Sequence, residues 1–298
     1  MLLKQYKDHF FDSLQNIQDE HEIESFFFIL TEYLHHLKRV DVALNPTFQL
    51  SEAEVEKWNI ILSELQEEKP IQYITGEAWF YGLRFEVNEN TLIPRPETEE
   101  LVAWILNSSS TQHPSPNTIL DIGTGSGCIP IALKANVPQA NVSAIDISEK
   151  ALEVAKRNAE LNKVAINFIQ ADILEVEDLS QISNSKLPIP NSQFPTNFDI
   201  IVSNPPYVRN LEKQEIKKNV LDYEPHLALF VEDTDALLFY RKIAQLALKN
   251  LSPNGLLFFE INQYLGKETV ELLQNLGFKN IELKKDIYGN DRMVKSEK

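Results

Sequence analysis

The chain has 298 residues, of which 43% are hydrophobic, enough for a sizeable core and too many for a disordered protein. Its 44 acidic and 28 basic residues give a formal net charge of −16, which argues against loose binding to a phosphate backbone. A single cysteine, Cys128, excludes an intrachain disulfide and a multi-cysteine zinc site. The histidines show no metal-ligand spacing, so no metal is expected. No signal peptide or membrane-spanning stretch is recognisable, and we expect a cytoplasmic protein.

The first 75 residues contain 14 acidic residues, six basic residues and no glycine. Residues 51–54 form a capping-box pattern. The apolar side chains that follow recur at helical spacing, at Trp58, Ile61, Leu62 and Leu65. The pattern predicts a small helical domain over residues 1–70. Its acidic faces are either a solvated surface or a docking surface for a substrate.

Residues 71–93 are rich in aromatic and β-branched side chains, and Gly76 and Gly82 interrupt them. This composition predicts a β-hairpin linker. The prolines of the segment Ile93-Pro-Arg-Pro-Glu-Thr-Glu99 predict an extended loop, with a helix beginning just after it and passing through Trp104. A second domain is expected over residues 94–298.

From residue 118 the chain alternates apolar strand patterns with amphipathic helix patterns. The strands are expected at 118–121, 142–146, 166–169, 198–203 and 256–261, and the helices at 128–135, 148–161 and 237–251. Residues 180–197 are expected to form a loop, and residues 281–294 two further strands. Alternation of this kind predicts an α/β fold of the Rossmann-like type, with a mostly parallel sheet covered on both faces.

A glycine-rich loop follows the first of these strands. Three of the nine glycines of the chain fall at Gly123, Gly125 and Gly127, where backbone can approach a ligand closely. No lysine follows, as a P-loop requires, and Cys128 stands where a dinucleotide fingerprint has its last glycine. Asp146, at the end of the next strand, is placed to accept hydrogen bonds from both hydroxyls of a ribose.

This loop, with Asp121 before it and Asp146 after it, resembles the cofactor motif of class I S-adenosylmethionine-dependent methyltransferases. The resemblance implies that Asp121 orients the methionine end of S-adenosyl-L-methionine and that Asp146 holds the ribose. It implies that the loop packs under the cofactor through Gly123, Thr124, Gly125, Ser126 and Gly127. Asp172, after the third strand, is expected either to contact the adenine or to cap a turn.

The fourth strand ends in Asn204, Pro205, Pro206 and Tyr207. The prolines stiffen the chain and leave carbonyl acceptors, and the asparagine adds a side-chain oxygen. Two acceptors, the Asn204 side-chain oxygen and the Pro205 carbonyl, can bind both N–H groups of a planar nitrogen, aim it at a methyl group and stabilise the positive charge that develops. Tyr207 offers a flat ring for stacking. No catalytic histidine or metal is required.

The segment resembles the motif of methyltransferases that act on planar nitrogens, either adenine N6 or a glutamine amide. By that resemblance Asn204 and Pro205 are catalytic and bind the substrate, Pro206 and Tyr207 complete its pocket, and Asn204 also borders the cofactor. Five segments then occur in a specific order, at 93–99, 121–127, 202–207, 223–229 and 286–292. Together they resemble the peptide chain release factor N5-glutamine methyltransferase family, from about Pro70 to Arg292.

That resemblance implies that the substrate is the glutamine of a Gly-Gly-Gln loop in class 1 peptide chain release factors, with residues 95–98 lining the entrance. One departure is that a glycine is expected soon after Glu260, whereas the chain continues Ile261-Asn262-Gln263. Two alternatives remain: an adenine-N6 methyltransferase acting on DNA or RNA, and a catalytically silent binding module. The acidic charge favours the protein substrate, with no direct nucleic-acid partner, and a monomer is the default.

Overall fold

The computed structural model describes residues 1–112, 117–184 and 194–298. The chain divides into two compact units. The first comprises Met1–Glu77 with Lys217–Tyr223, and the second comprises Ala78–Ile216 with Glu224–Lys298. Across the described residues, the helices are too short or too polar to cross a membrane.

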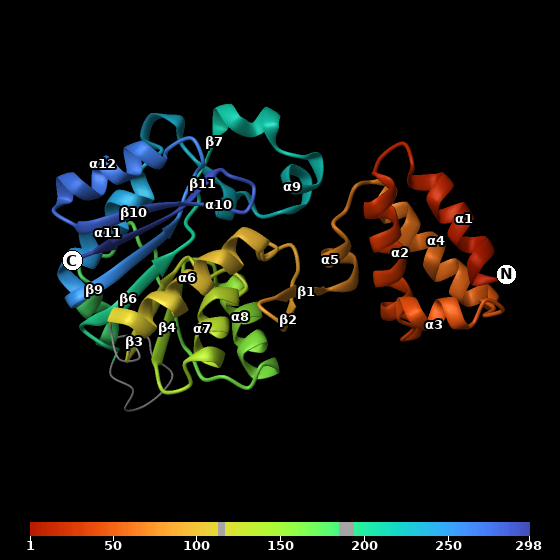
Figure 1. Ribbon diagram of the computed structural model, residues 1–298, viewed down its shortest axis with the longest axis horizontal. Helices are drawn as coiled ribbons and strands as arrows, with labels where there is room; N and C mark the ends of the chain where they lie inside the picture. The colour runs from red at the N-terminus through yellow and green to blue at the C-terminus, as the bar shows by residue number, and fades with distance from the viewer. Residues whose placement is uncertain (113–116, 185–193) are drawn as a thin grey trace. The chain divides into compact units, whose positions relative to one another are not determined.

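The first unit is helical, as the sequence predicts (Figure 1). Its helices are α1 (Leu3–Leu14), α2 (Glu20–His35), α3 (Arg39–Leu44), α4 (Glu52–Gln66), α5 (Ile71–Thr75) and α9 (Lys218–Tyr223). The core is aromatic: the rings of Tyr6, Phe10 and Phe27 lie 5.2, 5.8 and 5.3 Å from the fully buried Trp58. Such ring pairs stabilise a small core beyond the area that they bury.

The local signals for α4 are confirmed. The Ser51 hydroxyl accepts a hydrogen bond from the Glu54 backbone N–H, and the Glu54 carboxylate accepts one from the Ser51 N–H. This exchange satisfies two backbone groups that would otherwise lack partners at the start of the helix. The four apolar residues named above for this helix are all buried.

The segment around the predicted hairpin differs in part from the expectation. Residues 71–75 are the helix α5 rather than extended chain, because the helix starts directly after Pro70 and Gly76 ends it at a φ of 72°. The hairpin itself consists of β1 (Glu77–Phe80) and β2 (Leu83–Glu86). Its two turn residues, Tyr81 and Gly82, both have positive φ, as a type I′ turn requires.

The second unit is built on a seven-stranded sheet of order β10-β11-β9-β6-β3-β4-β5. Its strands are β3 (Thr118–Ile122), β4 (Asn141–Asp146), β5 (Asn167–Gln170), β6 (Phe198–Ser203), β9 (Leu251–Glu260), β10 (Lys279–Lys285) and β11 (Asp291–Glu297). The first five of these pair in parallel, and β10 and β11 add an antiparallel edge. After β5 the chain returns to the other side of β3, which makes the gap between β3 and β6 a topological switch point.

Helices cover both faces of the sheet, as predicted (Figure 1). One face packs against α11 (Leu238–Asn250) and α12 (Gly266–Leu276), and the other against α6 (Pro96–Gln112), α7 (Cys128–Asn136) and α8 (Glu149–Leu161). Alternate strand residues serve the two cores, as Leu257 and Phe259 face one and Leu256 and Phe258 the other. The confirmed α/β architecture therefore brings the carboxyl ends of β3, β4 and β6 to one edge.

The remaining elements are short. The predicted loop over 180–197 begins as a 3-10 helix, η1 (Leu179–Asn184), and its residues 185–193 lie outside the described part of the chain. After β6 come β7 (Val208–Arg209), η2 (Asn210–Glu215), α10 (His226–Leu229), β8 (Phe230–Val231) and η3 (Asp233–Asp235). The small parallel pair of β7 and β8 fixes the chain that leaves the Asn-Pro-Pro-Tyr segment.

Candidate active site

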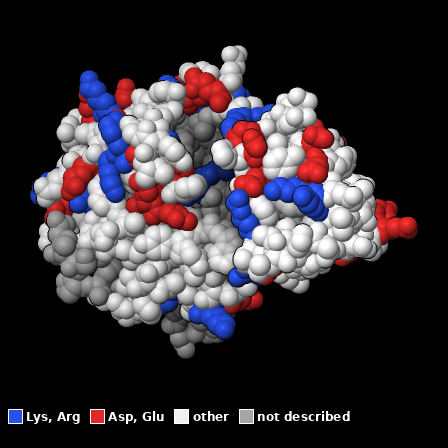
Figure 2. Space-filling view, turned by 45° about the vertical axis from the view of Figure 1, so that its right-hand side comes forward, with Lys and Arg blue, Asp and Glu red and all other residues white. Residues whose placement is uncertain are grey.

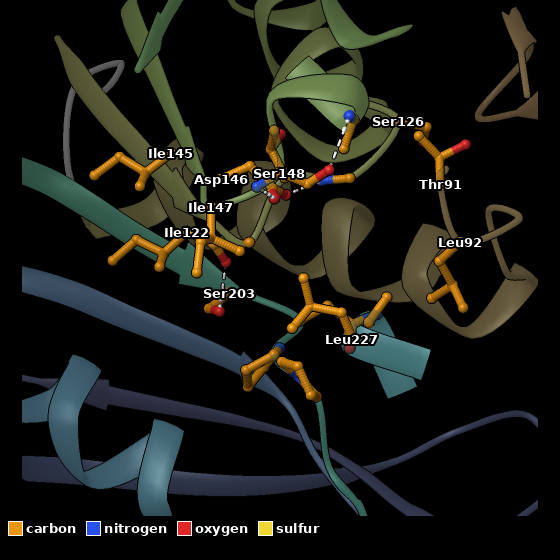
Figure 3. Close-up of a pocket in the computed structure, with 18 of the residues that line it drawn as sticks. Thr91, Leu92, Ile122, Ser126, Ile145, Asp146, Ile147, Ser148, Ser203 and Leu227 are labelled. Carbon is orange, nitrogen blue, oxygen red and sulfur yellow. Dashed lines mark hydrogen bonds between the residues drawn. The ribbon is translucent and has the colours of Figure 1, made fainter. Parts of the chain in front are cut away.

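A cavity of about 260 Å³ lies at the carboxyl ends of β3, β4 and β6. Residues from the glycine loop, the end of β4, the segment after β5 and the Asn-Pro-Pro segment all line it. In Figure 3, Asp146 and Ser148 lie on one side of this space, Ser203 lies below Ile122, and Thr91, Leu92 and Leu227 lie across from the end of β4. The structure thus brings together most of the residues that the sequence singles out.

Backbone hydrogen bonds to β4 hold the glycine loop in its conformation. The N–H groups of Gly123 and Thr124 both donate to the Ile145 carbonyl, at 2.8 and 3.1 Å. The three loop glycines have φ values of 78°, 54° and 81°, a region that side chains disfavour. Gly127 does not line the cavity. A Cβ there would meet Ala155 and Ile131 at 3.1 Å, so this glycine permits close packing of the loop on α8.

Asp146, at the end of the neighbouring strand β4, accepts hydrogen bonds at the glycine loop (Figure 3). Its Oδ2 accepts a hydrogen bond from the Gly125 N–H at 2.8 Å, and its Oδ1 accepts one from the Ser148 N–H at 2.9 Å. Burial raises the pKa of this carboxyl, while the backbone donors oppose the shift. Each oxygen retains a second lone pair, so the carboxylate can still accept hydrogen bonds from a ligand such as a ribose.

Asp121 lies behind the loop and is fully buried. Neither carboxyl oxygen has a partner with hydrogen-bond geometry among the described residues, and the Thr124 hydroxyl also lacks one. Burial raises the pKa of Asp121 to about 7. An unpaired buried carboxyl is costly, and a positively charged ligand bound in front of the loop would compensate for it. A sulfonium with a nearby ammonium group, as in S-adenosyl-L-methionine, fits that requirement.

Asp172 lines the cavity after β5, and it also caps a turn. Its Oδ1 accepts a hydrogen bond from the Leu174 N–H at 2.9 Å, and its carbonyl accepts one from Glu175. The geometry therefore allows Asp172 both to cap this turn and to face a ligand in the cavity. A contact between this carboxylate and an adenine amino group stays a prediction.

The Asn-Pro-Pro segment begins where β6 is tied to β3. The Ser203 hydroxyl donates to the Ile122 carbonyl at 2.6 Å (Figure 3). Asn204, Pro205 and Pro206 line the cavity, and the Asn204 Nδ2 donates to the Thr98 hydroxyl at 3.4 Å. Tyr207 does not line the cavity. Its hydroxyl instead donates to the Glu260 carboxylate at 3.2 Å.

Pro94 and Arg95, just before α6, and Thr98, in its first turn, also line the cavity. The Arg95 guanidinium pairs with the Glu224 carboxylate, whose other oxygen accepts a hydrogen bond from the Ile93 N–H at 3.2 Å. Glu224 is 4% exposed, so the pair joins the Pro-Arg-Pro segment firmly to the segment before α10. The sequence segments 93–99 and 223–229 are therefore joined beside the cavity.

Two buried polar residues near the site were not assigned a role from the sequence. Glu260, at the end of β9, is 1% exposed. Asn262 follows it where a glycine was expected, and its Nδ2 donates to the Tyr207 carbonyl at 2.9 Å and to the Glu212 carboxylate at 2.8 Å. An acidic residue that ends an apolar strand at the ligand edge of a parallel sheet is a signal that could have identified Glu260.

The single thiol lies in the first turn of α7, against the loop. Cys128 is 9% exposed, and burial raises its pKa to about 12. It therefore acts as a small apolar residue.

Comparison with known proteins covers both units. Residues 114–289 match the family model described as a methyltransferase domain, and residues 9–76 match the one described as the PrmC N-terminal domain. Among solved structures, the delta-N METTL16 methyltransferase domain has a TM-score of 0.51 at 17% identity, covering 84% of this chain and 99% of that one. At that identity the likeness concerns the fold alone, and it confirms the class I methyltransferase fold.

Curated relatives extend over nearly the whole chain. The release factor glutamine methyltransferase of Flavobacterium psychrophilum is 60% identical over 296 residues, which cover 99% of each chain. Its counterpart from Bacteroides thetaiotaomicron is 40% identical over 282 residues, which cover 95% of each chain. This chain belongs to the family of release factor glutamine methyltransferases.

Proposed function

We propose that this chain methylates the side-chain amide nitrogen (N5) of the glutamine in the Gly-Gly-Gln loop of class 1 peptide chain release factors. The observation that carries the proposal is the pairing, in one cavity, of a cofactor loop with the acceptor groups of Asn204 and Pro205. S-adenosyl-L-methionine, the methyl donor, supplies an electrophilic methyl group on a sulfonium. The glycine loop, Asp146 and Asp172 would hold it.

The chemical difficulty is the amide nitrogen, whose lone pair is delocalised into the carbonyl. The Asn204 Oδ1 and the Pro205 carbonyl can each accept one of its two N–H groups, which fixes the direction of the lone pair. These acceptors would also stabilise the positive charge that develops on nitrogen while its bond to the methyl carbon forms and the carbon–sulfur bond breaks, which leaves a neutral thioether. The nitrogen would then release one proton to solvent. Holding both reactants in line can lower the barrier by about 7–11 kcal/mol. No side-chain base is therefore required to begin the reaction.

The partner is proposed to be the protein alone, with no direct contact to nucleic acid, and the enzyme is proposed to act as a monomer in the cytoplasm, where release factors work. On the face that Figure 2 presents, groups of Lys and Arg side chains alternate with groups of Asp and Glu side chains. An adenine methyltransferase acting on DNA or RNA would require a basic stripe to neutralise phosphates. The net charge of −16 instead suits a basic protein surface.

The domain assignment is part of the same proposal. Residues 1–70 would recognise the release factor, residues 71–93 would link the domains, and residues 94–298 would carry the chemistry. The compact units of the structure divide the chain after Glu77, except that Lys217–Tyr223 also belongs to the first unit. The second unit holds every described residue that lines the cavity.

The decisive test is incubation with a release factor and S-adenosyl-L-methionine labelled in its methyl group. We expect one methyl group on the glutamine of the Gly-Gly-Gln peptide, located by mass spectrometry of fragments. A release factor with that glutamine replaced by alanine is the control and should take no label. Label on the control protein, or on added DNA or RNA with a steep salt dependence, would contradict the proposal.

A further inference from the structure

Three side chains from separate segments form a hydrogen-bonded chain behind Asn204. The Asn204 Nδ2 donates to the Thr98 Oγ1 at 3.4 Å, and this hydroxyl donates to the Glu260 Oε2 at 2.6 Å. The other carboxylate oxygen of Glu260 accepts a hydrogen bond from the Tyr207 hydroxyl at 3.2 Å. Thr98 is 3% exposed and Glu260 1%, so the hydrogen bond between these two side chains is shielded from water.

The directions of these hydrogen bonds determine the orientation of the asparagine. A hydroxyl has a single hydrogen, and that of Thr98 is directed to the carboxylate of Glu260, which can only accept while it is ionised. The Thr98 oxygen therefore presents lone pairs to Asn204. The side-chain amide of Asn204 meets them with its NH₂ group, and its Oδ1 lies on the other side of the amide. The flipped amide would place two oxygens face to face.

We propose that Thr98 and Glu260 are positioning residues that hold the Asn204 amide in the orientation in which its Oδ1 can accept a hydrogen bond from the glutamine substrate. This inference rests on the proposed role of Asn204. A flipped Asn204 would direct an N–H donor at the N–H groups of the substrate. The wrong orientation would therefore repel the group that has to be methylated and would fail to stabilise the charge that develops on it.

The surroundings of Glu260 favour its role as a fixed acceptor. The Arg292 side chain is close enough to stabilise the carboxylate electrostatically, and Asp286 holds Arg292 by an ion pair at 3.0 Å. Glu97 opposes this effect, and burial raises the pKa of the Glu260 carboxyl. Two hydroxyl donors and the charge of the partly exposed Arg292 therefore stabilise the carboxylate and offset the cost of its desolvation.

The test is a set of single-turnover measurements with native release factor. Thr98→Val keeps the shape of the side chain and removes the hydroxyl, and we expect methyl transfer to slow about 10- to 100-fold. The dissociation constant of the cofactor should change less than about threefold. Thr98→Ser restores the hydroxyl and should react within about threefold of the native rate. The control Thr269→Val alters a buried threonine of α12 and should keep the native rate.

A double-mutant cycle identifies the route of the effect. If Thr98 acts through Asn204, adding Thr98→Val to Asn204→Ala should slow the residual reaction by less than about twofold, because the group to be oriented is already gone. Adding Thr98→Val to Glu260→Leu should likewise have little further effect. Full additivity in both cycles, or a native rate in Thr98→Val, would overturn the inference. A native rate in Asn204→Ala would instead overturn the role proposed for Asn204.

Discussion

The two sides of the cavity are built from different kinds of groups. On the side of the glycine loop, the fixed groups are backbone N–H and carbonyl groups of residues 123–127 and 145, with the carboxylates of Asp121 and Asp146 around them. On the side of the Asn-Pro-Pro segment, the orientation of Asn204 depends on contacts between side chains. Substitution can delete a side chain but not a backbone group. We therefore expect substitutions on the side of the Asn-Pro-Pro segment to lower the rate of methyl transfer. Substitutions on the side of the glycine loop should instead disturb packing and charge.

The largest effect is expected for Asn204→Ala. Loss of one of the two acceptors should lower the turnover number by about 10²–10³-fold, because stabilisation of the transition state is lost. The cofactor dissociation constant, measured by calorimetry, should stay within about threefold. Asn141→Ala, at the exposed start of β4 and the opposite edge of the sheet, is the control. Equal losses in turnover number and in cofactor affinity would contradict the difference expected between the two sides of the cavity.

The packing of the loop is tested by Gly127→Ala. The new Cβ would lie 3.1 Å from Ala155 and Ile131 at a φ of 81°, so the free energy of unfolding should fall by about 2–4 kcal/mol. Gly289→Ala is the matched control, since its φ is 86° and a Cβ there would meet nothing within 4 Å. It should cost only about 1 kcal/mol. Equal unfolding midpoints in denaturant for the two variants would show that close packing on α8 is unimportant.

The charge behind the loop is tested by pH. The folded pKa of Asp121 is about 7 against an ordinary value of 3.8, so its neutral form favours folding at low pH. This contribution to the stability of the ligand-free enzyme should decline as the pH rises from about 4 through 7. A cationic cofactor favours the ionised form and should bind up to about tenfold more tightly at pH 8 than at pH 6.

The variant Asp121→Asn provides the control for that titration. It should bind the cofactor weakly and with the same affinity at both pH values. Calorimetry in buffers of different ionisation enthalpy should also detect a proton released on binding at pH 6 to the native enzyme alone. A pH dependence that persists unchanged in Asp121→Asn would assign the titration to another group, such as Asp146, whose charge acts on Asp121.

The smallest effect is expected on the acidic first unit. Neutralising two exposed carboxylates of α4, in the variant Glu52→Gln/Glu56→Gln, should raise the KM for an intact release factor about two- to fivefold, and more weakly at high salt. The KM for a short Gly-Gly-Gln peptide should not change. Glu153→Gln/Glu160→Gln, on the exposed side of α8, is the control. An unchanged KM for both substrates would favour the solvated-surface explanation.

Local patterns made much of the fold predictable. The capping box at Ser51, the spacing of the loop glycines and the apolar runs of β4 and β6 are each visible within a short stretch of sequence. The helix α5 was missed because β-branched and aromatic residues favour extended chain, whereas the position of Pro70 and Gly76 permits a helical turn. The helix α12, between β9 and β10, was also not predicted from the sequence.

The site was predictable where a motif is contiguous and not where distant segments meet. Thr98, Asn204 and Glu260 are 162 positions apart at the extremes and meet only because α6, β6 and β9 reach one edge of the sheet. Asn262 is a similar case. Its side chain binds the Tyr207 carbonyl from 55 residues away, so an asparagine serves where a glycine was expected.

The buried thiol has a consequence for the durability of the enzyme. Oxidation and alkylation both proceed through the thiolate, and a pKa of about 12 leaves almost none of it at neutral pH. Peroxide and maleimides should therefore spare the folded protein, even though its only cysteine borders the cavity. Labelling of Cys128 would then report transient opening of α7, which makes this residue a built-in probe of local unfolding.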